Sequence, residues 1–328
     1  MTVFHYINGG RILMHLEERI NEKKWTLLNR KLIEGSHAGN IYRIEALDDK
    51  KRKRNYIYKE FERDRNNEIV IYEQLSNLIS PYSKLVEIWD SFPQAILMHD
   101  LKSPLKNTFE KASLKKKRKL IEHILQRLSV LHTSRFDVES EDLPKHQITS
   151  EWQNWCIHQL KKLITQQQWA KTEWIETIEY AYDQLDLTNY KVKCPLVITH
   201  GDPHLENIFE SDDQIYFIDW EWTAVGSPLR DITILLQDVY EPELIQFVIH
   251  SYHSLLELRN LNILEKDYRK DFDFLYIDHT TMMLAWEIEK YFQGYTNVKS
   301  IMRIAEFKMK EIKRIMKEEI IIESKKPN

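Results

Sequence analysis

Cysteine and long apolar runs are both scarce in this sequence. Only two of the 328 residues are cysteine, Cys156 and Cys194, and no CxxC spacing joins them. This scarcity argues against a disulfide framework and against a cysteine-rich zinc site. No apolar run approaches the roughly 20 residues that a membrane-spanning helix needs, and the first ten residues lack the features of a secretory signal. We therefore expect a cytoplasmic location and no membrane partner.

An excess of basic charge is also absent. The chain has 47 basic and 51 acidic residues, which gives a formal net charge of −4. Since nucleic-acid-binding proteins usually present a basic face, we expect no nucleic-acid partner. The hydrophobic share of 42% and the charged share of 30% predict a folded chain. Its length favours two domains or lobes, each with its own core, and leaves the oligomeric state open.

The first part of the chain, residues 1–98, predicts a small lobe with a five-stranded antiparallel sheet and one main helix. Alternating apolar residues are typical of strands, and apolar residues three or four apart are typical of helices. The expected elements are a short helix at 10–23, strands at 25–33, 40–47 and 55–61, a helix at 63–80, and strands at 85–92 and 94–98.

The remainder, residues 102–328, predicts a larger and mainly helical lobe. Helical spacing begins at Leu114, continues over 150–185, and returns from Pro228 to the end. Two short β-segments, at 196–199 and 214–222, interrupt it. The fold class that we expect is therefore α+β.

The stretch "HGDPHLENIF", residues 200–209, concentrates polar side chains after an apolar segment. His200 and His204 would share one face of a helix and could then bind a transition metal. However, Pro203 lies between them and would break that helix, and no further His or Cys nearby completes a site. We interpret the stretch as a loop after a buried strand, in which a side-chain hydrogen bond from His200 braces the backbone.

Three oxygen-bearing side chains then follow one another at the ends of two β-segments. Asp202 precedes Asn207 by five positions, and Asp219 lies twelve positions after Asn207. Amide and carboxylate oxygens suit Mg²⁺, a hard cation. An Asp and an Asn at this spacing, with a later metal-binding Asp, form the phosphotransfer arrangement of protein kinases. Asp202 is then available to deprotonate a hydroxyl group.

That interpretation requires groups that hold phosphate in the first lobe. Lys59 lies in a predicted strand, and Glu68 lies nine residues later in the following helix, with Glu73 as an alternative partner for the lysine. The loop "EGSHAGN" at 34–40, with Gly35, Ser36 and His37, would cover the phosphates with its backbone N–H groups.

Each of these residues also has an ordinary structural interpretation. Lys59 could be a solvated lysine of an edge strand, Glu68 a surface charge of a helix, and Asp219 a turn residue at the end of a strand. The functional hypothesis depends on all of them occurring together, in one order and on compatible elements.

With these residues, the chain resembles the aminoglycoside phosphotransferase and choline kinase-like family, relatives of protein kinases. "HGDPHLENIF" resembles the family's HGDxxxxN loop, and "FIDWEWTAVGSPLRDI" resembles its IDWE…G…D segment. The resemblance covers about residues 25–260. It implies a bilobal protein kinase-like fold and the transfer of phosphate from ATP, with Mg²⁺, to a hydroxyl of a small molecule. It also implies Asp202 as catalytic base, Asn207 and Asp219 as magnesium ligands, and Lys59 with Glu68 as the phosphate anchor.

The same resemblance implies further roles. Asp231 would brace the catalytic loop, and Leu131-His132 matches a frequent "LH" pair at the end of a helix. Residues 99–101 would form a hinge between the lobes, after Met98 at the gatekeeper position. The backbone of His99 to Leu101 would pair with the adenine edge. Because the loop at 34–40 is sparse in glycine, the choice between ATP and GTP stays open.

The acceptor is less defined than the chemistry. Acids and aromatics gather in the helical segments at 235–300, and this combination suits a cationic aminosugar or amino alcohol, although helices also carry such residues for solvation and packing. Whether the acceptor is an antibiotic or a metabolite stays open. The main alternative is a kinase-like binding or spore-coat-type protein with little or no turnover. A protein kinase is disfavoured, since Asp219 begins DWE and no DFG is present.

Overall fold

The computed structural model describes residues 15–33, 40–62, 67–135 and 143–324, without the side chains of 320–324. The chain divides into two compact units. The first unit combines residues 1–107 with 207–222, and the second combines 108–206 with 223–328. Residues 207–222 therefore group with the N-terminal sheet, although they follow it by a hundred residues. The predicted lobe boundaries and the hinge at 99–101 stay a prediction.

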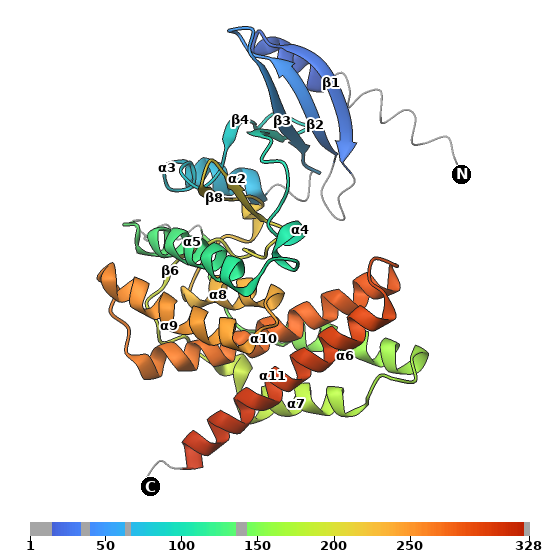
Figure 1. Cartoon of the computed structure of the whole chain (residues 1–328), viewed down its shortest axis with the longest axis vertical. Coiled ribbons are helices and arrows are strands. Elements are labelled where there is room, and N and C mark those ends of the chain that lie inside the picture. The colour runs from blue at the N-terminus through green and yellow to red at the C-terminus, as the bar shows by residue number, and fades with distance from the viewer. Residues whose placement is uncertain (1–14, 34–39, 63–66, 136–142, 325–328) are drawn as a thin grey trace. The chain divides into compact units, whose positions relative to one another are not determined.

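The first unit is built on one antiparallel sheet (Figure 1). Its strands are β1 (Thr26–Ile33), β2 (Ile41–Leu47), β3 (Lys53–Glu60), β4 (Leu85–Trp89) and β5 (Ala95–His99). Their order across the sheet is β1-β2-β3-β5-β4. The alternating residues that predict these strands pair in antiparallel register throughout, so the prediction of a five-stranded antiparallel sheet is confirmed.

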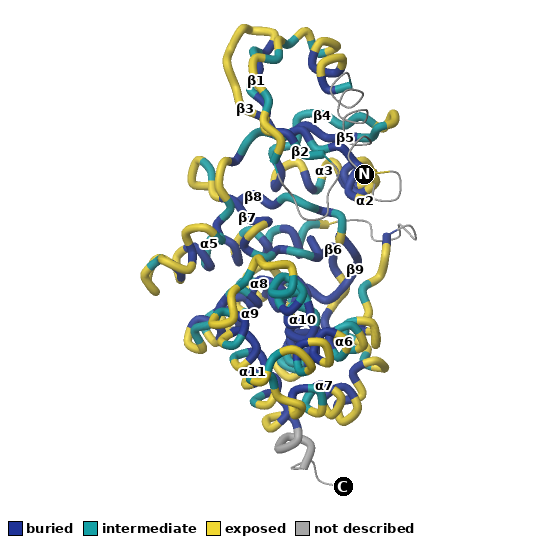
Figure 2. Tube along the Cα trace, turned by 90° about the vertical axis from the view of Figure 1, so that its right-hand side faces the viewer, coloured by how far each residue is buried: buried dark blue, intermediate teal, exposed yellow. Residues whose placement is uncertain are grey.

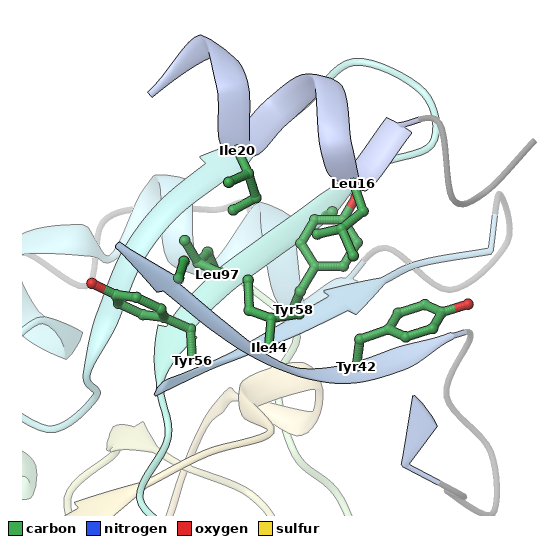
Figure 3. Close-up of a cluster of buried hydrophobic side chains, with 9 residues drawn as sticks. Leu16, Ile20, Tyr42, Ile44, Tyr56, Tyr58 and Leu97 are labelled. Atoms are coloured by element: carbon green, nitrogen blue, oxygen red, sulfur yellow. The ribbon is translucent and has the colours of Figure 1, made fainter. Parts of the chain in front are cut away.

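A small core forms on one face of this sheet. Leu16 and Ile20, from a helical segment at 15–22, are fully buried against Ile44, Tyr56 and Tyr58. Figure 3 shows the two aliphatic side chains pointing from the helix toward the strands. Because side chains alternate between the two faces of a strand, the neighbours of these tyrosines point the other way. Lys59 is one of them.

Two helices and a hairpin complete the first unit. The predicted helix at 63–80 is observed as α2 (Asn67–Gln74) and α3 (Ser76–Ile79), and its first four residues lie outside the described part. The hairpin consists of β7 (Ile208–Ser211) and β8 (Gln214–Phe217). Backbone hydrogen bonds join it to the rest of the unit, from Phe217 N–H to Tyr82 O and from Leu105 N–H to Ile208 O, each 2.8 Å.

The second unit is mainly helical, as predicted. Its long helices are α5 (Leu114–Thr133), α6 (Ser150–Gln166), α7 (Glu173–Gln184), α9 (Pro242–Leu258), α10 (Glu265–Phe292) and α11 (Val298–Ser324), with the shorter α8 (Leu229–Leu235); α4 (Lys106–Phe109) lies where the first unit ends. Ser113 caps α5 and Thr149 caps α6, each with a side-chain oxygen that accepts a backbone N–H. Helix α10 packs against α6, α8 and α11, and Figure 2 shows it largely buried.

Two short β-segments of the second unit pair with each other, and the first of them leads into the loop that contains Asp202. β6 (Val197–Thr199) pairs with β9 (Ala224–Gly226), and β9 was not expected from the sequence. The predicted β-segment at 214–222 is too long, since β8 ends at Phe217 and Trp220–Trp222 form a 3-10 turn. Aromatic residues, the buried Trp220 and the exposed Trp222, continue the strand pattern there, but Asp219 has a left-handed backbone (φ 66°) that does not fit a strand. Within the described residues, every helix is too short or too polar for a membrane span.

Candidate active site

Lys59, on β3 of the first unit, contacts two carboxylates. Its Nζ lies 2.6 Å from Glu68 Oε2 and 2.8 Å from Asp219 Oδ1. The side chains of Lys59 and Glu68 are 12% and 1% exposed, and that of Asp219 is 32% exposed. The fold thus brings together a strand lysine, a helix glutamate and an aspartate that follows the hairpin.

The sequence favours Glu68 as the partner of this lysine and leaves Glu73 as the alternative. Glu68 lies in the first turn of α2 and is buried, whereas Glu73 is exposed. The backbone N–H of Trp220 also points to Glu68 Oε1, at 3.4 Å. Glu68 therefore contacts both Lys59 and the segment that carries Asp219.

Electrostatics keeps this lysine charged. Burial disfavours its ammonium form, but the carboxylates of Glu68 and Asp219 outweigh that effect and raise the pKa of Lys59. Burial raises the pKa of Glu68, against the opposing effect of Lys59. The first unit consequently holds a fixed positive charge next to acidic groups, which suits the binding of an anion together with a cation.

The hairpin register places the two predicted metal ligands at one end of β7 and β8. Ile208 pairs with Phe217, and the next bond runs from Ile218 N–H to Asn207 O at 3.0 Å. Asn207 therefore lies opposite Ile218, the residue directly before Asp219. The Asn207 amide comes just before β7, and the Asp219 carboxylate comes just after β8. Both therefore lie at the same end of the hairpin, as the spacing in the sequence suggested.

The predicted nucleotide-base residues lie at the end of β5. Met98 is buried, and the His99 ring stacks on Tyr56 with centroids 5.1 Å apart. Leu101 belongs to a buried cluster with Phe209 and Tyr216 of the hairpin, and Ile218 packs against this cluster. Gly35, Ser36 and His37 lie outside the described residues.

Asp202 belongs to the second unit, in the loop after β6. Asp231 of α8 holds this loop, because its carboxylate accepts the N–H groups of His200 and Gly201, each at 2.8 Å. His132 Nε2 lies 2.8 Å from the same carboxylate. The N–H of Asp202 donates to His200 Nδ1 at 3.2 Å, which confirms the predicted hydrogen bond of that histidine. The side chain of Asp202 is 23% exposed.

Neighbouring groups keep the buried carboxylate of Asp231 ionised. Burial disfavours its carboxylate, but the contacts with His132, His200 and Arg230 outweigh burial and lower the pKa of Asp231. The resemblance implied a brace at this position, and the "LH" match supplies His132 as its partner.

His204 is a residue that the sequence reasoning left without a role. Its Nε2 lies 3.4 Å from Asp202 Oδ2. Burial lowers the pKa of His204, but Asp202 and the nearby Asp238 and Glu206 raise it to about 9. The feature of the sequence that could have indicated this contact is the position of His204 two residues after Asp202.

The sequence predicts that acids of the helical segments at 235–300 surround the acceptor, but one of them, Asp271, has a structural role. Asp271 is buried and accepts hydrogen bonds from Tyr190, Lys193 and Cys194, so it organises the segment before β6. Trp220 is a core residue of the first unit. By contrast, three half-buried tryptophans meet on α6 and α10. The Trp152 and Trp155 rings are 5.9 Å apart, and Trp155 and Trp286 are 6.2 Å apart.

Comparisons with known proteins show what this chain is similar to. Residues 98–260 match the model of the phosphotransferase enzyme family. Protein LicA of Haemophilus influenzae is 33% identical over 54 residues, which cover 16% of this chain and 20% of that protein.

Two solved structures share the fold over nearly the whole chain. Choline kinase LicA from Streptococcus pneumoniae has a TM-score of 0.60 at 16% identity and covers 93% of this chain and 99% of its own. Spectinomycin phosphotransferase, solved with ADP and spectinomycin, has a TM-score of 0.57 at 15% identity, with 91% and 98% covered. The protein kinase-like fold predicted from the sequence is therefore confirmed.

Proposed function

Because residues 98–260 belong to the phosphotransferase enzyme family, we propose that this chain transfers the γ-phosphate of ATP, with Mg²⁺, to a hydroxyl group of a small molecule. The observation that carries the proposal is the position of Lys59 Nζ, in contact with both Glu68 and Asp219. A buried lysine between two carboxylates is costly to desolvate. A phosphate group that binds the lysine, and a metal that binds Asp219, would offset that cost.

Asn207 and Asp219 are the residues that would hold Mg²⁺. Their side chains supply the oxygen donors that this ion prefers, and the hairpin register brings them to one end of β7 and β8. When bound, the ion would neutralise charge on the phosphate oxygens. Lys59 would bind the same phosphates as a fixed point charge, and Glu68 would orient it.

The base of the nucleotide would lie beside β5 in the first unit. Met98 is the proposed gatekeeper, and the backbone of His99 to Leu101 the edge that pairs with the base. The apolar cluster of Leu101, Phe209, Tyr216 and Ile218 would contact the adenine face. The proposed phosphate-covering residues are Gly35, Ser36 and His37. We favour ATP, with GTP as the alternative.

Asp202 is the proposed catalytic base. It would accept the proton of the acceptor hydroxyl as the oxygen attacks the γ-phosphorus and the bond to the leaving ADP oxygen breaks. The hydrogen bonds that the N–H groups of His200 and Gly201 donate to the Asp231 carboxylate hold the backbone next to Asp202. Phosphoryl transfer depends mainly on positioning and charge neutralisation, so a rigid loop suits this role.

We propose a cationic acceptor, an aminosugar or an amino alcohol. The support is the cluster of Trp152, Trp155 and Trp286, since aromatic faces attract ammonium groups. Lys290 Nζ already lies 5.7 Å from the centre of the Trp286 ring, so this surface accepts a cation. Both buried cysteines, Cys156 and Cys194, are free thiols, which agrees with the cytoplasmic location that we propose.

The test is an assay of ADP release with MgATP and a panel of hydroxyl compounds that includes choline, ethanolamine, homoserine, aminoglycosides and neutral sugars. We expect turnover with a cationic member of the panel and little with neutral sugars. Turnover with neutral sugars alone would contradict the cationic acceptor. Stabilisation by MgATP without turnover on any compound would instead favour the kinase-like binding protein.

A further inference from the structure

A second cluster of metal-ligating side chains lies in the helical unit. His146, Asp278 and His279 each bring one ligand atom to within 4.8 Å of those of the other two. His146 lies in the segment before α6, and the other two residues are neighbours in the middle of α10. None of the three has a role in the proposed phosphoryl transfer.

Asp278 has an unused oxygen. Its side chain is fully buried, and Oδ1 accepts a hydrogen bond from the Tyr182 hydroxyl at 2.5 Å. Among the described residues, Oδ2 has no hydrogen-bond partner. Burial raises the pKa of Asp278 to about 7. A buried carboxylate oxygen without a partner is costly, and a bound cation would remove that cost.

His279 presents one ring nitrogen with a free electron pair. Its Nδ1 lies 2.7 Å from Thr233 Oγ1, and that hydroxyl has backbone carbonyl oxygens at 2.8 and 3.0 Å. The single hydroxyl proton of Thr233 is donated to a carbonyl oxygen, so the hydroxyl oxygen accepts a hydrogen bond from the N–H at His279 Nδ1. The neutral imidazole then keeps Nε2 as an acceptor. Metal-binding histidines commonly have such a partner on their other nitrogen.

The backbone holds His146 in place beside these residues. Its N–H donates to Val225 O at 2.9 Å, and Val225 N–H donates to Pro144 O at 2.8 Å. A Cβ at Gly226 would lie 3.2 Å from His146 Cβ, so glycine permits this close approach. The His146 and His279 rings are 5.7 Å apart. Burial lowers the pKa of both histidines, to about 3 for His146, which leaves both imidazoles neutral.

Arg230 is the charge that opposes a cation here, since it also lowers the pKa of both histidines. It is buried, and its Nη1 donates to Thr199 Oγ1 at 2.9 Å. Burial lowers its pKa, and the carboxylates of Asp231, Asp202 and Asp278 only partly oppose that effect. An ion held by bonds to imidazole nitrogen tolerates a nearby cation better than one held by charge alone.

We propose that His146, Asp278 Oδ2 and His279 Nε2 form a binding site for a divalent transition ion of the zinc class. Two imidazoles and one carboxylate are a ligand set that zinc takes at about 2.0–2.2 Å, with a fourth position open to water. Ligand atoms on one ion lie at most about 4 Å apart at these bond lengths, so the side chains need only small torsional movements. The ion would join the segment before α6 to α10.

The test uses the full chain, freed of metal with a chelator and titrated with Zn²⁺ by calorimetry and with Co²⁺ by visible absorption. We expect one equivalent of Zn²⁺ to bind and Co²⁺ to give the ligand-field bands of a nitrogen and oxygen site. His146→Ala, at a partly exposed position, should lose this equivalent and keep its stabilisation by MgATP, which shows that it is folded. The control His158→Ala, on the exposed side of α6, should bind as wild type does.

A graded variant tests the orientation of the ligands. Tyr182→Phe removes the hydrogen bond to Asp278 and keeps the ring, so Zn²⁺ affinity should fall about 10- to 100-fold. Absence of stoichiometric Zn²⁺ binding in the wild type, or unchanged binding in His146→Ala, would overturn the site. Equal affinity in Tyr182→Phe would remove Asp278 from the ligand set and would overturn the three-ligand site as well.

Discussion

Lys59 Nζ lies 2.8 Å from Asp219 Oδ1, although 160 residues separate the two in the sequence. The contact forms within one compact unit, because the hairpin of β7 and β8 groups with the N-terminal sheet. Lys59, Glu68, Asn207 and Asp219, the proposed groups for the phosphates and for Mg²⁺, therefore belong to the same compact unit. Asp202, the proposed base, belongs to the other unit, so binding and transfer can be tested separately.

Lys59→Met should reduce kcat/KM for MgATP by about 100- to 1,000-fold, as expected for the loss of a fixed charge at a transferring phosphate. Glu68 would then be buried without its ion-pair partner. The matched control is Lys53→Met, on the same strand, whose side chain is 62% exposed and pairs with Glu45. Steady-state ADP release measures both variants. Comparable losses in the two would show that Lys59 has no special role.

Asp219→Asn should largely abolish the rise in Tm that MgATP gives the wild type. Ligand at 100 times its Kd stabilises a protein by about 2.7 kcal/mol, so the shift is measurable. Asparagine tolerates the positive φ of 66° at this position, so backbone strain does not confuse the result. Asp212→Asn, at φ 52° in the hairpin turn, is the control and should keep the full shift. An unchanged shift in Asp219→Asn would refute its role as a metal ligand.

Asp202→Asn should keep the MgATP-dependent rise in Tm and lose phosphoryl transfer by about 100- to 10,000-fold, the usual contribution of general base catalysis. The measurement is single-turnover transfer to the best acceptor of the panel. If transfer survives at the wild-type rate, Asp202 is not the base.

Asp231→Asn should destabilise the chain by about 2–4 kcal/mol. The carboxylate accepts two backbone N–H groups and contacts His132, and an amide presents one oxygen and an NH₂ to these groups, so buried donors lose their acceptors. Denaturant unfolding followed by tryptophan fluorescence gives the value. Asp213→Asn, an exposed residue of the hairpin turn, should change stability by less than about 0.5 kcal/mol.

The ion pair of His204 and Asp202 predicts a pH dependence of stability. The folded-state pKa of His204 is raised to about 9, above its unfolded value of about 6.5. The stabilising effect is therefore fully present below about pH 6.5 and is lost as the pH rises through about 9. The difference in unfolding free energy between wild type and His204→Gln should shrink over this range, by about 1–3 kcal/mol. A difference that is constant with pH would contradict the ion pair.

Much of the first unit could be predicted because its signals are local. In the strand Lys53–Glu60, Tyr56 and Tyr58 alternate with Ile57 and Lys59, so the sequence indicates both a strand and the face that Lys59 occupies. The break at Asp219 is less visible, because aromatic residues continue the strand pattern into Trp220–Trp222. Only the left-handed backbone of Asp219 shows where β8 has ended.

By itself, the sequence determined the order and type of most elements, although not β9 or the end of β8. It also determined the candidates Lys59, Asp202, Asn207 and Asp219, since periodicity and spacing are properties of neighbouring residues. The tertiary structure supports Glu68 over the alternative Glu73 as the contact of Lys59, and it alone decided that Asp231 meets His132 and that His146 meets α10. His132 and Asp231 are separated by 99 residues, and no local pattern records such contacts. They form because burying apolar surface brings distant elements together, and buried charges then require partners that only the packed chain supplies.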